Sequence, residues 1–460
     1  MRLRKNRSRF GSYFRSANAK GIGRSAMLLL LLLAVAGIVA AGFILFEFER
    51  PVVAVDRDIK FIGGSVELPF HAADRKSGIS EISITLRQNS TVYPLFERQF
   101  PRQSWLSQAG PAEVRETVAI DAKKSALKEG AADLVLMVRD FSLKRNTTEV
   151  HLPVTVDSSA PKVMIDHAPL QLMPGGSGIV LYSLSEACEK HGAMLGKRFF
   201  QGYPVAGKNN LFVAYLALPW KSEKLEETQV IAVDQAGNQG QASFSAHFKP
   251  AKDKTDRINI SDGFLNKKIP EFQEYYPEMP GTTNIEKYLF VNNKVRVSNA
   301  EKIAAVCRDT VPEQLWHDRF LRMPGAKRAG YADQRTYYYK GQPIDHQTHL
   351  GIDLASTARA EVRAANRGRV IFAEYLGIYG NMIIIDHGQG LASLYSHLSR
   401  IETAVGKTVA KDEVIGRTGN TGMAGGDHLH FAMLVHGIFV TPTEWWDQHW
   451  IDVNINKVIR

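Results

Sequence analysis

The alternation of hydrophobic and polar positions divides the chain into segments of different kinds. The first is an uncharged run, residues 26–46, which contains the leucines Leu28 to Leu33. About twenty apolar residues span the core of a bilayer, so this run predicts a single transmembrane helix. The alternative is a cleaved signal peptide, whose apolar region is usually shorter and ends at a site of small residues. Because the run here continues to Phe46, we favour an uncleaved anchor.

Residues 51–250 are dominated by short segments in which hydrophobic and polar positions alternate. Examples are Ile79 to Leu86, Leu134 to Val138, Val150 to Val156, Val230 to Val233 and Ala242 to Ala246. Successive side chains of a strand point to opposite faces, so this pattern predicts strands with one buried face. Each half ends in a strand, an aspartate, a turn and a last alternating strand, which resembles the late hairpin of bacterial Ig-like modules. We therefore predict two tandem Ig-like β-sandwiches, at residues 51–157 and 160–250.

The pattern of residues 260–330 changes from strand-like to helix-like. Ser298 to Glu301 has the form of a capping box in front of an apolar stretch, and Asp262 to Phe272 is a shorter helix candidate that ends near Pro270. We predict a helical connector here. It either packs as a collar against the following domain or lies across the groove of that domain and restrains its activity.

The net charge is concentrated at the N-terminus. The chain has a formal charge of +10, and residues 1–24 hold eight Lys or Arg without any acidic residue, which leaves +2 for the rest. The basic character is therefore a property of the tail and gives no reason to expect a nucleic-acid partner. Basic residues beside a membrane span stay in the cytoplasm. Residues 1–25 are thus predicted to be a cytoplasmic tail, with everything after residue 50 outside the cytoplasm.

The two cysteines of the sequence, Cys188 and Cys307, fall in different predicted domains. Their spacing matches neither a disulfide framework nor a zinc motif. We expect two unpaired and mostly buried thiols, although the predicted compartment permits a bridge.

The last predicted domain, residues 331–450, is rich in metal-type side chains, chiefly His349, Asp353, His397, His428 and His430. Residues 427–435 are predicted to be a strand, so His428 and His430 share one of its faces. A single histidine in a strand is more often a satisfied core or surface residue than a ligand. Several such side chains together in apolar strands favour metal binding more strongly than a single histidine does. An unpartnered buried polar group costs a few kcal/mol, and coordination of a metal ion removes that cost. Three such ligands with one open position are the donor set of a catalytic zinc.

Five short motifs in this domain occur together. They are His-Leu-Gly-Ile-Asp-Leu-Ala from 349, Tyr-Gly-Asn-Met-Ile-Ile-Ile-Asp-His-Gly from 379, Leu-Tyr-Ser-His-Leu-Ser from 394, Thr-Gly-Asn-Thr-Gly from 418 and His-Leu-His-Phe from 428. In combination they resemble the lysostaphin-type, or LytM-type, zinc metallopeptidases. The resemblance implies a mainly antiparallel β catalytic domain in which His349, Asp353 and His430 hold zinc. It also implies that His397 and His428 are catalytic imidazoles that do not bind the metal.

The sequence departs from this family at two positions. Pro343 stands where staphylococcal-type members carry a tyrosine, and Asp427 replaces the usual proline before the paired histidines. The nearest tyrosines before the first ligand are Tyr337, Tyr338 and Tyr339, which are candidates for a hydroxyl in the transition state. An inhibitory arm in some relatives supplies an extra zinc ligand, for which the connector offers Asn292, Asn293, Asn299 and His317.

The resemblance implies a metalloendopeptidase that hydrolyses peptide bonds of peptidoglycan cross-links or stems in cell-wall remodelling. With the predicted span, this gives a single-pass protein of the bacterial cytoplasmic (inner) membrane whose C-terminal domains lie in the periplasm. Expected partners are the peptidoglycan peptide, the membrane, and cell-wall or divisome proteins that contact the Ig-like modules. Two other functions stay open: an activator or scaffold for other cell-wall hydrolases, and a wall-binding structural protein. Metal content separates the enzyme from both.

Overall fold

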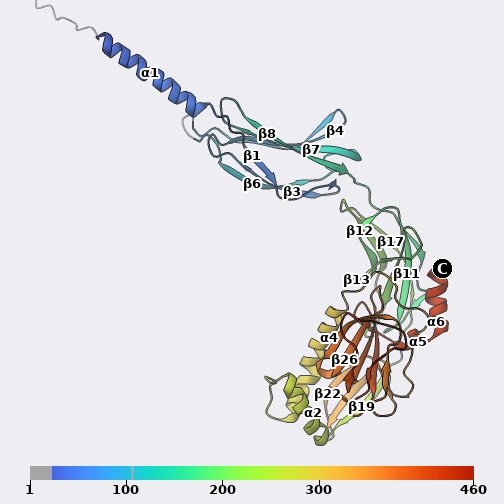
Figure 1. Cartoon of the computed structure of the whole chain (residues 1–460). Coiled ribbons are helices and arrows are strands. Elements are labelled where there is room, and N and C mark those ends of the chain that lie inside the picture. Colours follow the sequence, from blue (N-terminus) through green and yellow to red (C-terminus); the bar gives the residue numbers. More distant parts are fainter. Residues whose placement is uncertain (1–22, 105–107, 460) are drawn as a thin grey trace, which may run out of the picture. The chain divides into compact units, whose positions relative to one another are not determined.

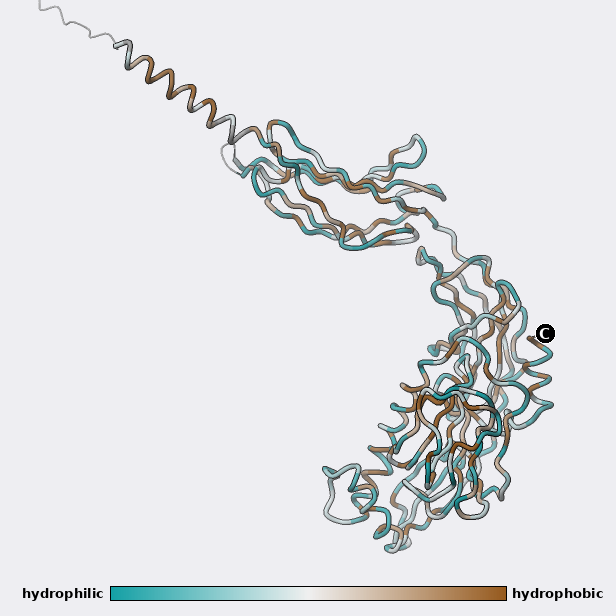
Figure 2. Tube along the Cα trace, viewed as in Figure 1, coloured by the Kyte–Doolittle hydropathy of each residue, from teal (hydrophilic) through white to brown (hydrophobic). Residues whose placement is uncertain are grey.

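The first element of the computed structural model, which describes residues 23–104 and 108–459, is the helix α1 (Arg24–Leu45) (Figure 1). Its leucines Leu28 to Leu33 are exposed, and Figure 2 shows the hydrophobic colouring along the helix. In the described part of the chain, however, no helix is long and apolar enough to cross a membrane. The transmembrane helix predicted at residues 26–46 is therefore not supported. Most of the predicted tail, residues 1–25, lies outside the described residues.

The chain is mainly β, as predicted, and divides into two compact units, residues 1–158 and 159–460. The first unit holds two sheets. One has the order β1 (Val52–Val55), β3 (Val66–Ala73), β6 (Glu113–Ile120); the other has the order β2 (Phe61–Ile62), β8 (Thr147–Val156), β7 (Gly130–Asp140), β4 (Ile79–Gln88), β5 (Thr91–Gln99). Ile82, Ile84 and Leu86 of β4 are buried in one core with Leu68 and Phe70 of β3. From Ile82 onward, every second residue of β4 is thus buried, as the alternation in the sequence predicts. That these sheets form an Ig-like sandwich stays a prediction.

The second unit begins with two sheets of four strands each, which we call the second β module. One has the order β14 (Tyr203–Pro204), β15 (Leu211–Ala217), β11 (Ser177–Leu184), β9 (Val163–His167); the other has the order β13 (Arg198–Gln201), β12 (Cys188–Leu195), β16 (Thr228–Asp234), β17 (Gln239–Ser243). A short parallel pair, β10 (Gln171–Leu172) and β18 (His247–Phe248), accompanies them. Cys188 is half-buried and Cys307 is buried, and both thiols are free, as predicted.

The connector contains helices, and one of them begins at Asp262, as predicted, whereas the other helices begin elsewhere. It consists of β19 (Lys254–Ile260), α2 (Asp262–Tyr275), α3 (Asn284–Phe290), the π-helical turn η1 (Val291–Val295) and α4 (Arg296–Val306). The capping box lies at Thr283 and Glu286, before α3. The predicted capping box at Ser298 to Glu301 is wrong, because α4 continues directly from η1 and Ser298 lies inside it. α2 also passes through Pro270 and does not end there.

The C-terminal part is built on an eight-stranded sheet. Its order is β20 (Ala326–Ala329), β23 (Ile352–Ala355), β31 (Leu429–Val435), β27 (Leu391–Leu398), β26 (Asn381–Asp386), β25 (Gly368–Tyr375), β29 (Thr408–Val409), with β32 (Ile438–Val440) beside β31. These pairs are all antiparallel. Two three-stranded sheets flank it: β19, β21 (Asp333–Tyr339), β22 (Gln342–His349), and β24 (Glu361–Arg363), β30 (Val414–Arg417), β28 (Arg400–Ile401).

The second β module and the C-terminal sheet share one hydrophobic core, in which Tyr215 meets Trp445 of α5 (Pro442–Trp446). Polar contacts reinforce this junction. Glu444 Oε2 accepts a hydrogen bond from Ser177 N at 2.9 Å, and Trp445 Nε1 donates to Ser177 Oγ at 3.1 Å. The module is therefore a fixed part of the body that carries the candidate site, and its loops are available to line that site.

Candidate metal centre

Strand pairing brings three metal-type side chains together. His349 ends β22, Asp353 lies in β23 and His430 lies in β31. β23 and β31 pair with Asp353 directly opposite His430. The backbone at Gly351 lies close to the His430 ring, and only glycine permits this, because a Cβ there would lie 2.5 Å from that ring. The site is thus set by sheet register and one glycine.

The donor atoms of these residues form a small triangle. His349 Nε2 lies 2.9 Å from both Asp353 Oδ1 and His430 Nδ1, and His430 Nδ1 lies 3.0 Å from Asp353 Oδ1. Ligands bound about 2.0–2.1 Å from a tetrahedral ion are separated by roughly 3.3 Å. The triangle therefore has about the size that one metal ion requires, and all three side chains are buried.

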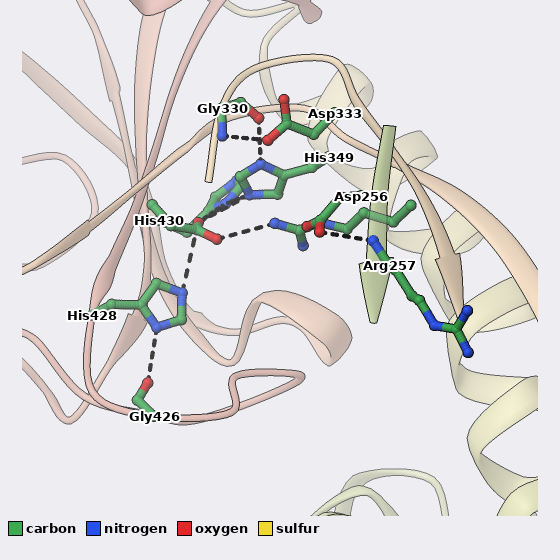
Figure 3. A network of polar contacts seen from close by, with 10 residues as sticks. Asp256, Arg257, Gly330, Asp333, His349, Gly426, His428 and His430 are labelled. Atoms are coloured by element: carbon green, nitrogen blue, oxygen red, sulfur yellow. Dashed lines mark hydrogen bonds and ion pairs between the residues drawn. The ribbon is translucent and has the colours of Figure 1, made fainter. Parts of the chain in front are cut away.

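The hydrogen bonds around the triangle indicate where the protons are. The carbonyl of Gly330 only accepts, and it lies 2.7 Å from His349 Nδ1, so His349 presents the lone pair of Nε2 to the centre (Figure 3). His430 Nε2 is buried and has no hydrogen-bond partner among the residues that the structure describes. An imidazole nitrogen and a carboxylate oxygen thus converge on one point, an arrangement that a cation stabilises.

The electrostatics of the triangle favour the forms that bind metal. Burial raises the pKa of Asp353, but the imidazoles of His349 and His430 outweigh it and hold that pKa well below its ordinary value. Burial lowers the pKa of His430 to about 4. Near neutral pH the carboxylate is therefore ionised and the imidazole is neutral. Arg335 of β21 lies 3.4 Å from Asp353 Oδ2 through Nη2, which leaves Oδ1 for the centre.

Two further imidazoles lie beside the triangle, with their ring centroids 4.9 Å apart: His397 and His428. His397 Nδ1 is 2.9 Å from the carbonyl of Thr421, and His428 Nδ1 is 2.8 Å from the carbonyl of Gly426 (Figure 3 shows the second contact). Since carbonyls only accept, Nδ1 carries a proton in both rings, and Nε2 is the nitrogen turned away from that carbonyl. His428 Nε2 lies 3.6 Å from Asp353 Oδ1. Burial lowers the pKa of His397 well below its ordinary value.

All five predicted site residues line one cavity of about 940 Å³. The cavity wall is not confined to the C-terminal sheet. The connector contributes Phe264 and Tyr288, and the second β module contributes Trp220 and Lys221. The structure thus joins three predicted domains at one site.

The candidate tyrosines and extra ligands are placed differently. Tyr337 lines the cavity, and so does Tyr379, which the sequence did not single out. Asn292, Asn293, Asn299 and His317 do not appear among the described residues that line it. The first two donate to the Asp345 carboxylate, and Asn299 accepts from Ile378 N. The structure therefore gives no support to an extra ligand from the connector.

Comparison with known proteins identifies the family of the C-terminal domain. Residues 347–442 match the profile of Peptidase family M23. This part of the chain is an M23 peptidase domain. It contains all five of the residues predicted from the resemblance. Arg335 and the Gly330 carbonyl, which support the triangle, precede the matched range and had no signal in the sequence.

Curated relatives match this chain over the M23 domain. The DD-carboxypeptidase/endopeptidase Mpg of Neisseria meningitidis is 41% identical over 106 residues, which cover 23% of this chain and 24% of the relative. The peptidoglycan DD-endopeptidase ShyA of Vibrio cholerae is 35% identical over 89 residues, 19% of this chain and 21% of the relative. The murein hydrolase activator EnvC of Escherichia coli is 33% identical over 95 residues, 21% and 23% respectively. The chain thus spans about a quarter of the length of these relatives.

Solved structures also match. A putative peptidase M23 from Pseudomonas aeruginosa is 20% identical, with a TM-score of 0.38, over 60% of this chain and 95% of that one. The catalytic domain of lysostaphin from Staphylococcus simulans is 26% identical, with a TM-score of 0.23, over 26% of this chain and 92% of that one.

Proposed function

We propose that this protein is a zinc metalloendopeptidase that hydrolyses peptide bonds in the cross-links or stems of bacterial peptidoglycan. The observation that carries the proposal is the buried triangle of His349, Asp353 and His430, with the imidazoles of His397 and His428 beside it in one cavity. Relatives named as a peptidoglycan DD-endopeptidase and a DD-carboxypeptidase/endopeptidase support this class of substrate.

The residues present fit zinc. Two imidazoles and one carboxylate, with a further position open, are a donor set of catalytic zinc sites. When bound, zinc would polarise the scissile carbonyl and make water a better nucleophile at neutral pH. Gly330 holds His349 with Nε2 towards the centre, and Arg335 holds the outer oxygen of Asp353. Such supporting contacts orient ligands and keep them in one geometry.

His397 and His428 would carry out the proton transfers. Each has Nδ1 committed to a backbone carbonyl, so Nε2 is the nitrogen that acts on the reacting atoms. One ring accepts a proton from the attacking water and delivers it to the leaving amine. The other ring would have to carry a proton on both nitrogens, so that Nε2 can donate a hydrogen bond to the oxyanion. Both rings line the cavity that would take the peptide.

A second candidate function is the activation of other cell-wall hydrolases, which the name of the relative EnvC favours. An activator needs no converging donor atoms, whereas this chain has three within 4.8 Å of one another, so we place the enzyme first.

A digest of purified peptidoglycan by the full chain tests the enzyme. We expect mass spectrometry to show broken peptide bonds and intact glycan strands, because the site is built to attack a carbonyl carbon. A zinc chelator should stop the reaction, and added zinc should restore it. A zinc-free or zinc-bound chain that leaves peptidoglycan intact, yet raises the activity of an added cell-wall hydrolase, would establish the activator.

We also propose that the domains after residue 50 work outside the cytoplasm, where peptidoglycan lies. The eight basic residues among residues 1–24, which precede the apolar run, support this orientation. An alkaline phosphatase fusion after Asp157 should therefore be active, and a reporter that works only in the cytoplasm should be silent at the same junction. The opposite pair of results contradicts the proposal. A soluble product with a new N-terminus near residue 47 would identify a cleaved N-terminal segment.

A further inference from the structure

The connector helix α2 holds the backbone on both sides of Thr421. Lys268 Nζ donates to the carbonyl of Asn420, and Glu271 Oε1 accepts from Gly422 N. The two side chains are themselves paired, with Lys268 Nζ 2.9 Å from Glu271 Oε2. The Lys268 side chain is only 3% exposed. Lysine is rarely buried unless it is paired, so this contact is a specific feature of the fold.

Thr421 is the residue that orients His397. Its carbonyl accepts from His397 Nδ1 at 2.9 Å, which turns Nε2 of that ring to the cavity. Its hydroxyl ties the same loop to two strands of the M23 sheet, since Oγ1 donates to Leu398 O at 2.9 Å and accepts from Asn381 N at 3.0 Å. The position of the Thr421 backbone therefore sets the position of the His397 ring.

His397 needs such support because of its backbone. Its φ is +63°, in the left-handed region, which a non-glycine residue occupies only where its surroundings hold it. The loop around Thr421 also has no room to shift. A Cβ on Gly422 would overlap the backbone nitrogen of Gly380, and one on Gly380 would overlap Thr421 Oγ1. A small displacement of residues 420–422 would thus be passed on to His397.

We propose that Lys268 and Glu271 are positioning residues for the His397 imidazole. They fix the backbone of residues 420–422, so that the Thr421 carbonyl keeps His397 Nε2 in place at the reacting atoms. The effect on catalysis rests on the proposed peptidase function, while the contact itself does not. α2 is then neither a passive collar nor an inhibitory arm but a part of the catalytic assembly, and the M23 domain is incomplete without it.

Alanine and methionine substitutions in the zinc-loaded full chain test the proposal on a soluble cross-linked muropeptide. Glu271→Ala and Lys268→Met should each lower kcat by roughly tenfold or more, because misplacing a catalytic group by about 1 Å costs up to ~100-fold. KM and zinc content should stay within about twofold of the wild-type values, since neither residue belongs to the triangle of His349, Asp353 and His430. Lys267→Met and Glu274→Ala, which change exposed residues of the same helix, are the matched controls and should behave as wild type. Glu271→Gln keeps an acceptor for Gly422 N and should retain most of the activity.

A charge swap separates positioning from helix stability. The double variant Lys268→Glu with Glu271→Lys keeps an ion pair at the same spacing in α2. Its new glutamate, however, has no proton for the Asn420 carbonyl, and its new lysine has no acceptor for Gly422 N. Positioning predicts that kcat stays low in the swapped chain. If the swap restores wild-type kcat, the pair merely stabilises α2 and the proposal is wrong. The proposal is equally wrong if Glu271→Ala and Lys268→Met have wild-type kcat.

Hydrogen exchange gives a measurement that does not depend on activity. The Gly422 amide should exchange faster in Glu271→Ala than in wild type and Glu274→Ala, because it loses its acceptor. If the Gly422 amide exchanges at the wild-type rate in Glu271→Ala, the contact between Glu271 and Gly422 is contradicted, whether or not the chain is an enzyme. If wild type neither binds zinc nor cleaves the muropeptide, the proposed function fails, and faster exchange in Glu271→Ala would still support the contact.

Discussion

Replacing His349, Asp353 or His430 by alanine is expected to abolish zinc binding and peptidoglycan cleavage together. Each residue supplies one donor atom to a triangle whose sides are 2.9–3.0 Å. Two remaining ligands are too few for a site that also keeps an open position. The zinc content of the purified chain, measured after dialysis, should fall from about one per chain to near zero. The digest of peptidoglycan should fall to background in the same samples.

The controls for this experiment follow from the surroundings of the triangle. His449→Ala removes an exposed histidine of α6 (Gln448–Ile451) and should keep both zinc and activity. Asp353→Ala also leaves Arg335 without its carboxylate, so Asp353→Asn, which keeps the shape of the side chain, should be compared with it. Both variants should melt cooperatively if the chain is folded. An Asp353→Ala chain with full zinc occupancy and full activity would contradict the assignment.

The five site residues could be predicted because each lies in a short motif on a regular element or directly beside one. The strand predicted at residues 427–435 begins at Leu429, and His428 forms an isolated bridge with Gly419 just before it. His430 and its neighbours show the strand pattern, and His349 and Asp353 are only four residues apart. The pattern alone does not bring residue 349 to residue 430; this came from the resemblance to a family. The structure shows the physical link, which is the register that sets Asp353 opposite His430.

The supporting residues could not be predicted, because their partners are far away in the sequence. Arg335 reaches Asp353 from β21, and Lys268 reaches Asn420 from α2, across 152 positions. Neither contact leaves a period or a motif in the local sequence. The false capping box at Ser298 has a related cause. A local signal was correct in form, but the preceding helical turn had already satisfied the backbone there.

Replacing His397 or His428 is expected to leave zinc in place and to lower turnover by roughly a hundredfold or more. Neither ring belongs to the triangle, and each commits Nδ1 to a backbone carbonyl. Removing one ring therefore leaves all three ligands but takes away one nitrogen that faces the substrate cavity. Zinc content and kcat, measured on the same preparation, separate this result from loss of metal.

The choice of substitution matters at His397, whose φ is +63°. Alanine is strained in the left-handed region, whereas asparagine occupies it more readily, so His397→Asn removes the imidazole with less disturbance of the backbone. Zinc loss in His397→Asn would show that this ring is a ligand and that the site is misassigned. The double variant of His397 and His428 adds a further test. If both rings serve one proton-transfer sequence, the second substitution should cost much less than it does alone, because residues that act as a unit are not additive.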